Sequence, residues 1–165
     1  MTTLKPHELV GATINIHDEG TRLVFSPAAL AYKNGVDLIA LIKSDSVAAA
    51  PEIEKWANQA RLQPLSDAKV AVYMLVGADD ESCTPMQYGG LLLDHDIEIV
   101  RAMSATTKIV TLYGSGAPYL DLLGSLECDA LLVPREYGED RCSVVGLQPN
   151  QPTSSLTFSL VLNEH

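Results

Sequence analysis

The segment 113–118, Tyr-Gly-Ser-Gly-Ala-Pro, contains the residues whose types and spacing could bind a phosphate. It follows an apolar run and precedes a predicted helix, where a glycine turn can present free backbone N–H groups to an anion. Gly114, Ser115 and Gly116 would form the turn, and Glu136 comes about 20 residues later, as a ribose-binding carboxylate does in a dinucleotide fold. Tyr119 occupies the place of the third glycine. The segment is therefore predicted to be either a nucleotide or small-molecule site or, preferably, an ordinary strand-to-helix turn.

A second cluster, Asp94-His95-Asp96, has the residue types of a metal site but the wrong spacing. Adjacent residues of a helix point in different directions and cannot converge on one ion. Asp94 is predicted to be the helix N-cap, and Asp96 a first-turn acid that suits the helix dipole. No metal ligand is assigned, and no cofactor is predicted.

Nucleophilic catalysis would require a nucleophile, a base and an orienting group. The chain has neither a Gly-x-Ser-x-Gly nor a His-Glu-x-x-His motif, and Cys83 lies beside an acidic run that disfavours its thiolate. Its four histidines and three cysteines form no recognisable catalytic or zinc-binding pattern: His7, His17, His95, His165, Cys83, Cys128 and Cys142. No catalytic residue is assigned, and a non-enzyme is favoured.

Charge gives the main indication of a partner. The 165 residues include 21 acidic and 11 basic side chains, with a formal net charge of −10, which disfavours nucleic acid and anionic membranes as partners. Two acidic segments are predicted either to be merely solvated or to bind a basic protein partner, namely Asp79, Asp80 and Glu81, with Asp18 and Glu19 as a second turn. A homo-oligomer is also possible.

The N-terminal residues lack a secretory pattern, and the apolar runs are shorter than the roughly 20 residues of a membrane-spanning helix. The odd number of cysteines and the absence of a Cys-x-x-Cys pair are typical of thiols in a reducing compartment. These features predict a cytoplasmic protein.

Two segments suggest an internal repeat. Residues 23–42 and 91–113 each read as an apolar strand, a capped helix of about two turns and a second apolar strand, with Ser26 and Asp94 as the caps. Within the first, Val36–Ile42 is predicted to be a central strand.

Repeat-like units are accordingly expected at about 12–43 and 69–114. The first strand, near residues 13–16, is expected to pair antiparallel with residues 23–25, and a long helix is expected at 51–62. The fold class is α+β or α/β, a single domain (1–165) in which two related strand–helix–strand units form a mixed sheet.

Residues 89–94, Gly-Gly-Leu-Leu-Leu-Asp, and 109–114, Ile-Val-Thr-Leu-Tyr-Gly, flank a predicted short helix. This segment resembles one found in small bacterial immunity-type proteins of polymorphic-toxin systems. The resemblance covers less than half of the chain. It implies a protein that binds and blocks a partner toxin, for which an acidic surface suits a basic catalytic cleft.

Overall fold

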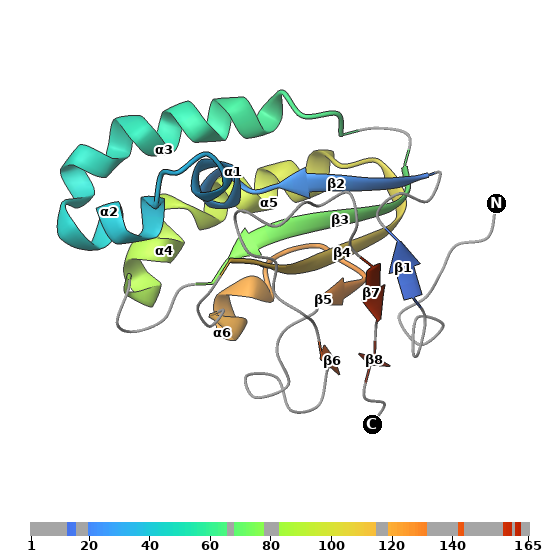
Figure 1. The fold of residues 1–165 in the computed structure, drawn as a ribbon. Helices are drawn as coiled ribbons and strands as arrows, with labels where there is room; N and C mark the ends of the chain where they lie inside the picture. The colour runs from blue at the N-terminus through green and yellow to red at the C-terminus, as the bar shows by residue number, and fades with distance from the viewer. Residues whose placement is uncertain are drawn as a thin grey trace.

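The computed structural model describes residues 13–15, 20–65, 68–77, 83–114, 119–131, 142–143, 157–159 and 161–162. The described chain forms an α/β fold around one four-stranded sheet (Figure 1). No helix of these residues is both long and apolar enough to cross a membrane.

The sheet consists of β2 (Thr21–Phe25), β3 (Ala68–Val76), β4 (Ala105–Tyr113) and β5 (Ala130–Leu131), in that spatial order. All three pairings are parallel, so the prediction of a mixed sheet was wrong. The sequence of β3 explains its central position, because every residue from 70 to 76 is buried and a parallel strand is usually covered on both faces.

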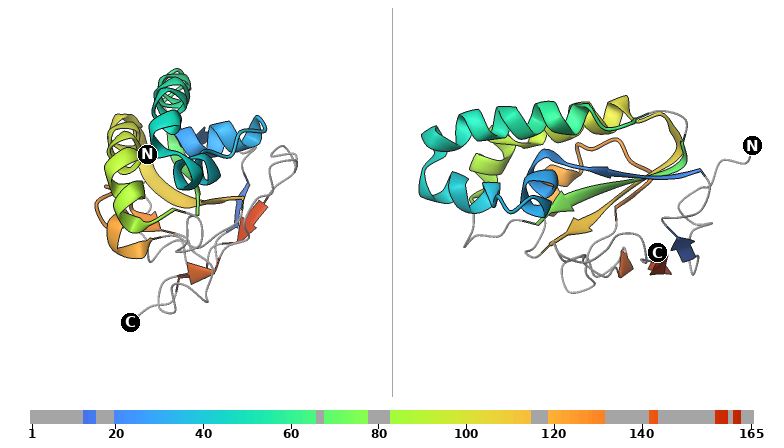
Figure 2. Two further views of the ribbon diagram at one scale, coloured as in Figure 1. Left: turned by 90° about the vertical axis from the view of Figure 1, so that its left-hand side faces the viewer. Right: turned by 45° about the horizontal axis from the view of Figure 1, so that its top comes forward.

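Because the strands follow one another in chain order, right-handed crossovers place the connecting helices on one face of the sheet. Figure 2 shows α3 and α5 together on that side. Val24, Tyr73 and Val110 are register partners on neighbouring strands and share a face of the sheet. All three are fully buried.

The connection from β2 to β3 begins with α1 (Pro27–Lys33). Ser26 is its N-cap, with Oγ accepting a hydrogen bond from the Ala29 amide, and Pro27 occupies the first turn, as predicted. Asn34 is the C-cap, and Gly35 follows with a positive φ of 87°, a conformation that glycine adopts readily and that ends the helix.

The predicted strand Val36–Ile42 is instead helix α2 (Leu38–Ser44). Asp37 caps this helix through a bond from the Ala40 amide, and Asp45 caps α3 (Ser46–Arg61) directly after it. The prediction of helix at 51–62 is therefore confirmed, although α3 begins five residues earlier than expected.

The connection from β3 to β4 contains α4 (Pro85–Leu91) and α5 (Leu93–Ala102). Residues 91–93 were predicted to be a strand but join these two helices. The N-cap of α5 is Leu92, which makes no side-chain cap bond, so the assignment of Asp94 as the cap was wrong.

The two strand–helix–strand units of the predicted repeat are consequently not observed. Residues 23–42 end in a helix, whereas 91–113 begin in one. In 23–42 the first strand and the helix after it agree with the prediction, and in 91–113 the helix and the final strand agree. Past β4 the described chain contains α6 (Leu120–Leu123), a short helix where one was predicted to follow the glycine turn.

Two small antiparallel ladders accompany the sheet. β1 (Thr13–Asn15) pairs with β7 (Thr157–Ser159), and β6 (Cys142–Ser143) pairs with β8 (Val161–Leu162). The predicted pairing of the first strand with β2 was wrong, because β2 pairs with β3. Figures 1 and 2 show both ladders on the side of the sheet away from α3 and α5.

Candidate functional site

The carboxyl ends of the strands are the first place to look for a ligand site. In open α/β sheets, ligands bind beyond these ends at a point where the strand order reverses. Here β2, β3 and β4 end at Phe25, Val76 and Tyr113, and the order of the four strands follows the chain. The strands that the structure describes thus contain no such reversal.

Gly114 directly follows β4, and its surroundings require a glycine. Its φ is +83°, and a Cβ built on its backbone would lie 2.7 Å from Cε1 of Tyr32. Both the backbone conformation and the close approach of α1 therefore account for this residue without a ligand. The other members of the predicted ligand site, Ser115, Gly116 and Glu136, lie outside the described residues, so that site stays a prediction.

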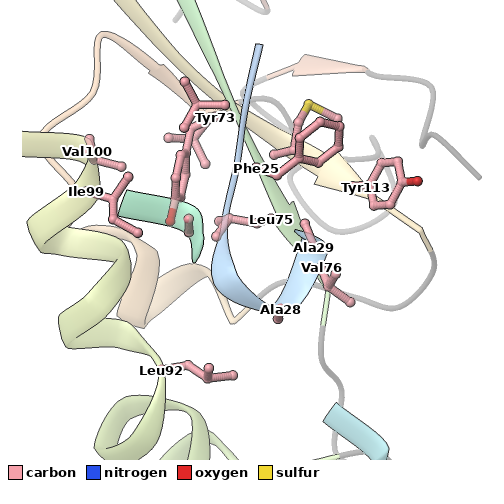
Figure 3. Close-up of a cluster of buried hydrophobic side chains, with 14 of the residues drawn as sticks. Phe25, Ala28, Ala29, Tyr73, Leu75, Val76, Leu92, Ile99, Val100 and Tyr113 are labelled. Atoms are coloured by element: carbon pink, nitrogen blue, oxygen red, sulfur yellow. The ribbon is translucent and has the colours of Figure 1, made fainter. Parts of the chain in front are cut away.

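Aromatic rings fill the space around the end of β4. The ring of Tyr113 lies edge-on to Phe25, with centroids 5.2 Å apart, and to Tyr32 at 6.2 Å. Figure 3 shows Phe25 and Tyr113 side by side. Lys33 Nζ lies 4.5 Å from the centroid of the Phe25 ring. This cluster packs α1 against the sheet edge by apolar and cation–π contact.

The most distinctive polar group of the described core is the carboxyl of Asp96 on α5. Tyr73 of β3 donates its hydroxyl hydrogen to Oδ1 at 2.7 Å, and Tyr88 of α4 donates to Oδ2 at 2.6 Å. All three side chains are buried, with Asp96 2% exposed. The carboxyl therefore joins three elements that are consecutive in the chain, and Figure 3 shows Tyr73 extending towards the helix that carries Ile99 and Val100.

Burial raises the pKa of Asp96 to about 6, although the two phenol hydrogen bonds act in the opposite direction. Burial, and next the charge of Asp96, raises the pKa of Tyr73 and of Tyr88 well above 10. Both phenols therefore stay protonated near neutral pH and can donate to the carboxylate. The cluster is enclosed, so its chemistry is proton binding within the fold rather than attack on a substrate.

The three residues of the Asp94-His95-Asp96 tripeptide lie in different environments, as their helical spacing predicts. Asp94 is exposed, Asp96 is buried between the tyrosines, and His95 Nδ1 lies 2.9 Å from a guanidinium nitrogen of Arg61. Partial burial, followed by the charge of Arg61, lowers the pKa of His95. Arg61 also pairs with Glu98 at 2.9 Å, so this polar contact fastens α3 to α5.

Among the described residues, no three His, Cys, Asp or Glu side chains are arranged to hold a metal ion. Cys83 is buried and Cys128 is partly buried.

The predicted partner-binding residues lie outside the described ranges, but the fold fixes where their segments begin and end. Asp18 and Glu19 precede Gly20, whose carbonyl accepts a hydrogen bond from the Lys69 amide at 2.7 Å, at the beginning of β3. Residues 78–82 follow Gly77, at the other end of β3. Eight residues of strand separate the two attachment points by about 26 Å, at about 3.3 Å per residue.

Charge is distributed unevenly between the described part of the chain and the rest. Ten of the 21 acidic and eight of the 11 basic residues lie in the described ranges, which carry a formal charge of −2. The remaining segments carry −8.

The Tyr73–Asp96–Tyr88 cluster was not predicted from the sequence. One signal could have located it, because Asp96 lies three residues after Leu93 and four before Val100, and thus on the apolar face of its helix. An acid at such a position needs a buried partner.

Comparisons with protein-family models, with curated proteins and with solved structures find no match to this chain.

Proposed function

We propose that this chain is a non-enzymatic protein-binding module whose acidic segment at residues 78–82 docks on a basic surface of its partner. The observation that carries the proposal is the distribution of charge. Asp79, Asp80 and Glu81 are three consecutive acids in a chain whose formal net charge is −10. A basic partner would be attracted to such a run of like charge.

The surroundings of the acids in the chain support this segment in particular. Two acids of the helical face are paired at the surface, Glu98 with Arg61 and Glu127 with Arg101. No Lys or Arg occurs between Lys69 and Arg101, a stretch that includes the whole acidic run. The second acidic turn, Asp18 and Glu19, is followed after three residues by Arg22.

The proposed role agrees with the resemblance to immunity-type proteins, in which an acidic protein blocks a basic toxin. Complementary charge accelerates association and makes the association rate sensitive to salt. The partner's chemistry is thus a protein with a cluster of Lys and Arg around the site to be covered.

The experiment compares two double variants of equal charge change. Proteins captured from native lysate at low salt are identified, and the affinity of each purified candidate is measured at several salt concentrations. Asp79→Lys with Asp80→Lys is expected to weaken binding at least tenfold and to reduce its salt dependence. Asp18→Lys with Glu19→Lys is the matched control, attached at the opposite end of β3, and is expected to change binding much less.

Equal affinity and equal salt dependence for the Asp79/Asp80 variant and the unmodified protein would contradict the proposed surface. Equal losses in both variants would show that only the overall charge matters, which would contradict the assignment to residues 78–82.

A further inference from the structure

Helix α4 depends on a single buried side chain for much of its attachment. It has seven residues, fewer than the roughly 12 that an isolated helix requires in water. Met86 near its start is 87% exposed, whereas Tyr88 is 4% exposed and is the helix's buried residue. The Tyr88 ring contacts Tyr119, and its hydroxyl donates to Asp96 at 2.6 Å.

Asp96 provides the other half of this attachment and has no ion pair among the described residues. Within the described part of the chain, its two oxygens accept hydrogen bonds from Tyr73 and Tyr88 only. An ionised carboxylate held away from water without a cation is costly. If α4 moves away, Asp96 loses one phenol but gains water, so ionisation favours the open arrangement.

We propose that the Tyr73–Asp96–Tyr88 cluster is a proton-dependent clamp on α4, in which protonated Asp96 holds the helix closed and ionised Asp96 favours its local opening. In the closed form, burial raises the pKa of Asp96 from 3.8 to about 6. In the open form Asp96 is hydrated and keeps the ordinary pKa value of 3.8. Between pH 3.8 and about 6 the closed form therefore binds more protons than the open form. The closed state is therefore fully stabilised below pH 3.8, and this stabilisation is lost as the pH rises through about 6.

The other titratable groups around the cluster do not produce the same change. Cys83, at the beginning of the α4 segment, raises the pKa of Tyr88, and Arg61 at the end of α3 slightly opposes the upward shift of Tyr73. Both phenols stay neutral from pH 5 to 8. His95 is adjacent on α5 but contacts Arg61, and its lowered pKa makes its protonation in acid oppose folding. As the pH rises, the titration of Asp96 and the titration of His95 therefore change stability in opposite directions.

Native-state hydrogen exchange of the full chain tests the clamp. The amides of Tyr88 and Leu92, bonded to the carbonyls of Thr84 and Tyr88, report the opening of α4. After correction for intrinsic exchange rates, the opening equilibrium constant is expected to be about tenfold larger at pH 8 than at pH 5, from the shift of Asp96. The amides of α3 are the internal reference and are expected to change much less.

Three variants separate the clamp from a merely structural contact. Asp96→Asn should abolish the pH dependence of α4 opening, and His95→Gln should preserve it. Tyr88→Phe removes a hydrogen bond that lowers the pKa of Asp96, so it should move the midpoint to higher pH. This variant decides the question if Asp96→Asn does not fold.

Three results would overturn the clamp. One is pH-independent opening in the unmodified protein, and another is an unchanged midpoint in Tyr88→Phe. The third is an equal pH dependence in α3 and α4, which would show that Asp96 acts on global unfolding only.

Discussion

The two long connections of the sheet lie on the same face but are held there by different kinds of contact. The first, from β2 to β3, has three helices with side-chain caps from Ser26, Asp37 and Asp45. Apart from the capping hydroxyl of Ser26, its buried side chains are apolar, with Ile42 and several alanines fully buried. The second, from β3 to β4, has two helices, and its buried face includes the carboxyl of Asp96.

This difference shows that a parallel crossover can be fastened by two kinds of contact with different sensitivity to conditions. Apolar burial does not depend on proton concentration, because no group changes its charge. The contact through Asp96 does depend on it, because a buried carboxyl is easier to accommodate when neutral. The first connection should therefore respond to lost volume, and the second to lost hydrogen bonds and to pH.

The largest expected effect comes from removing core volume in the first connection. Ile42→Ala should reduce the free energy of unfolding by about 2–5 kcal/mol, because Ile42 is fully buried and its loss leaves a cavity. Urea denaturation should give similar losses at pH 5 and pH 8. Val47→Ala is the control, since Val47 is 83% exposed, and should change stability by less than about 0.5 kcal/mol. Similar losses in the two variants would contradict the packing of α2 described above.

A smaller, pH-dependent effect is expected in the second connection. Tyr73→Phe removes a donor to Asp96 and should cost about 1.5–3 kcal/mol at pH 8, where the carboxyl is ionised, but only about 0.5–1.5 kcal/mol at pH 5. The cost is larger at pH 8 because the hydrogen bond from Tyr73 lowers the pKa of Asp96 and so stabilises its ionised form. The variant without this bond therefore loses more stability as the pH rises. Tyr32→Phe is the control, expected within about 0.5 kcal/mol at both values. If Tyr73→Phe costs the same at pH 5 and pH 8, the second connection does not depend on pH, and it then does not differ from the first in this respect.

Much of the fold could be predicted where a local signal was unambiguous. The apolar runs at 70–76 and 108–113 are strands, and Ser26-Pro27 begins a helix. The run at 36–42 was assigned wrongly because a short apolar stretch is equally compatible with a strand and a buried helix. The deciding residues were Asp37 and Asp45, which cap α2 and α3.

The polar cluster could not be predicted for a different reason. Its members lie 23 and 8 residues from Asp96, and only the packing of α4 and α5 on β3 brings them together. Fully buried acids are rare, and so Asp96 was explained from the sequence only as a first-turn acid that suits the helix dipole, which did not indicate its burial. The residue type alone does not reveal whether an aspartate is buried or exposed to solvent.

The smallest expected effect comes from two aspartates near helix N-termini, Asp45 at α3 in the first connection and Asp94 at α5 in the second. Oδ1 of Asp45 accepts hydrogen bonds from the amides of Val47 and Ala48, so Asp45→Ala should cost about 1 kcal/mol. Asp94 is exposed in the first turn of α5 and does not cap it, so only its favourable interaction with the helix dipole is lost in Asp94→Ala, about 0.3 kcal/mol. Asp45→Asn keeps a capping oxygen and is the matched control, expected to be nearly neutral. Equal losses for Asp45→Ala and Asp94→Ala in urea denaturation would restore Asp94 as a cap of α5.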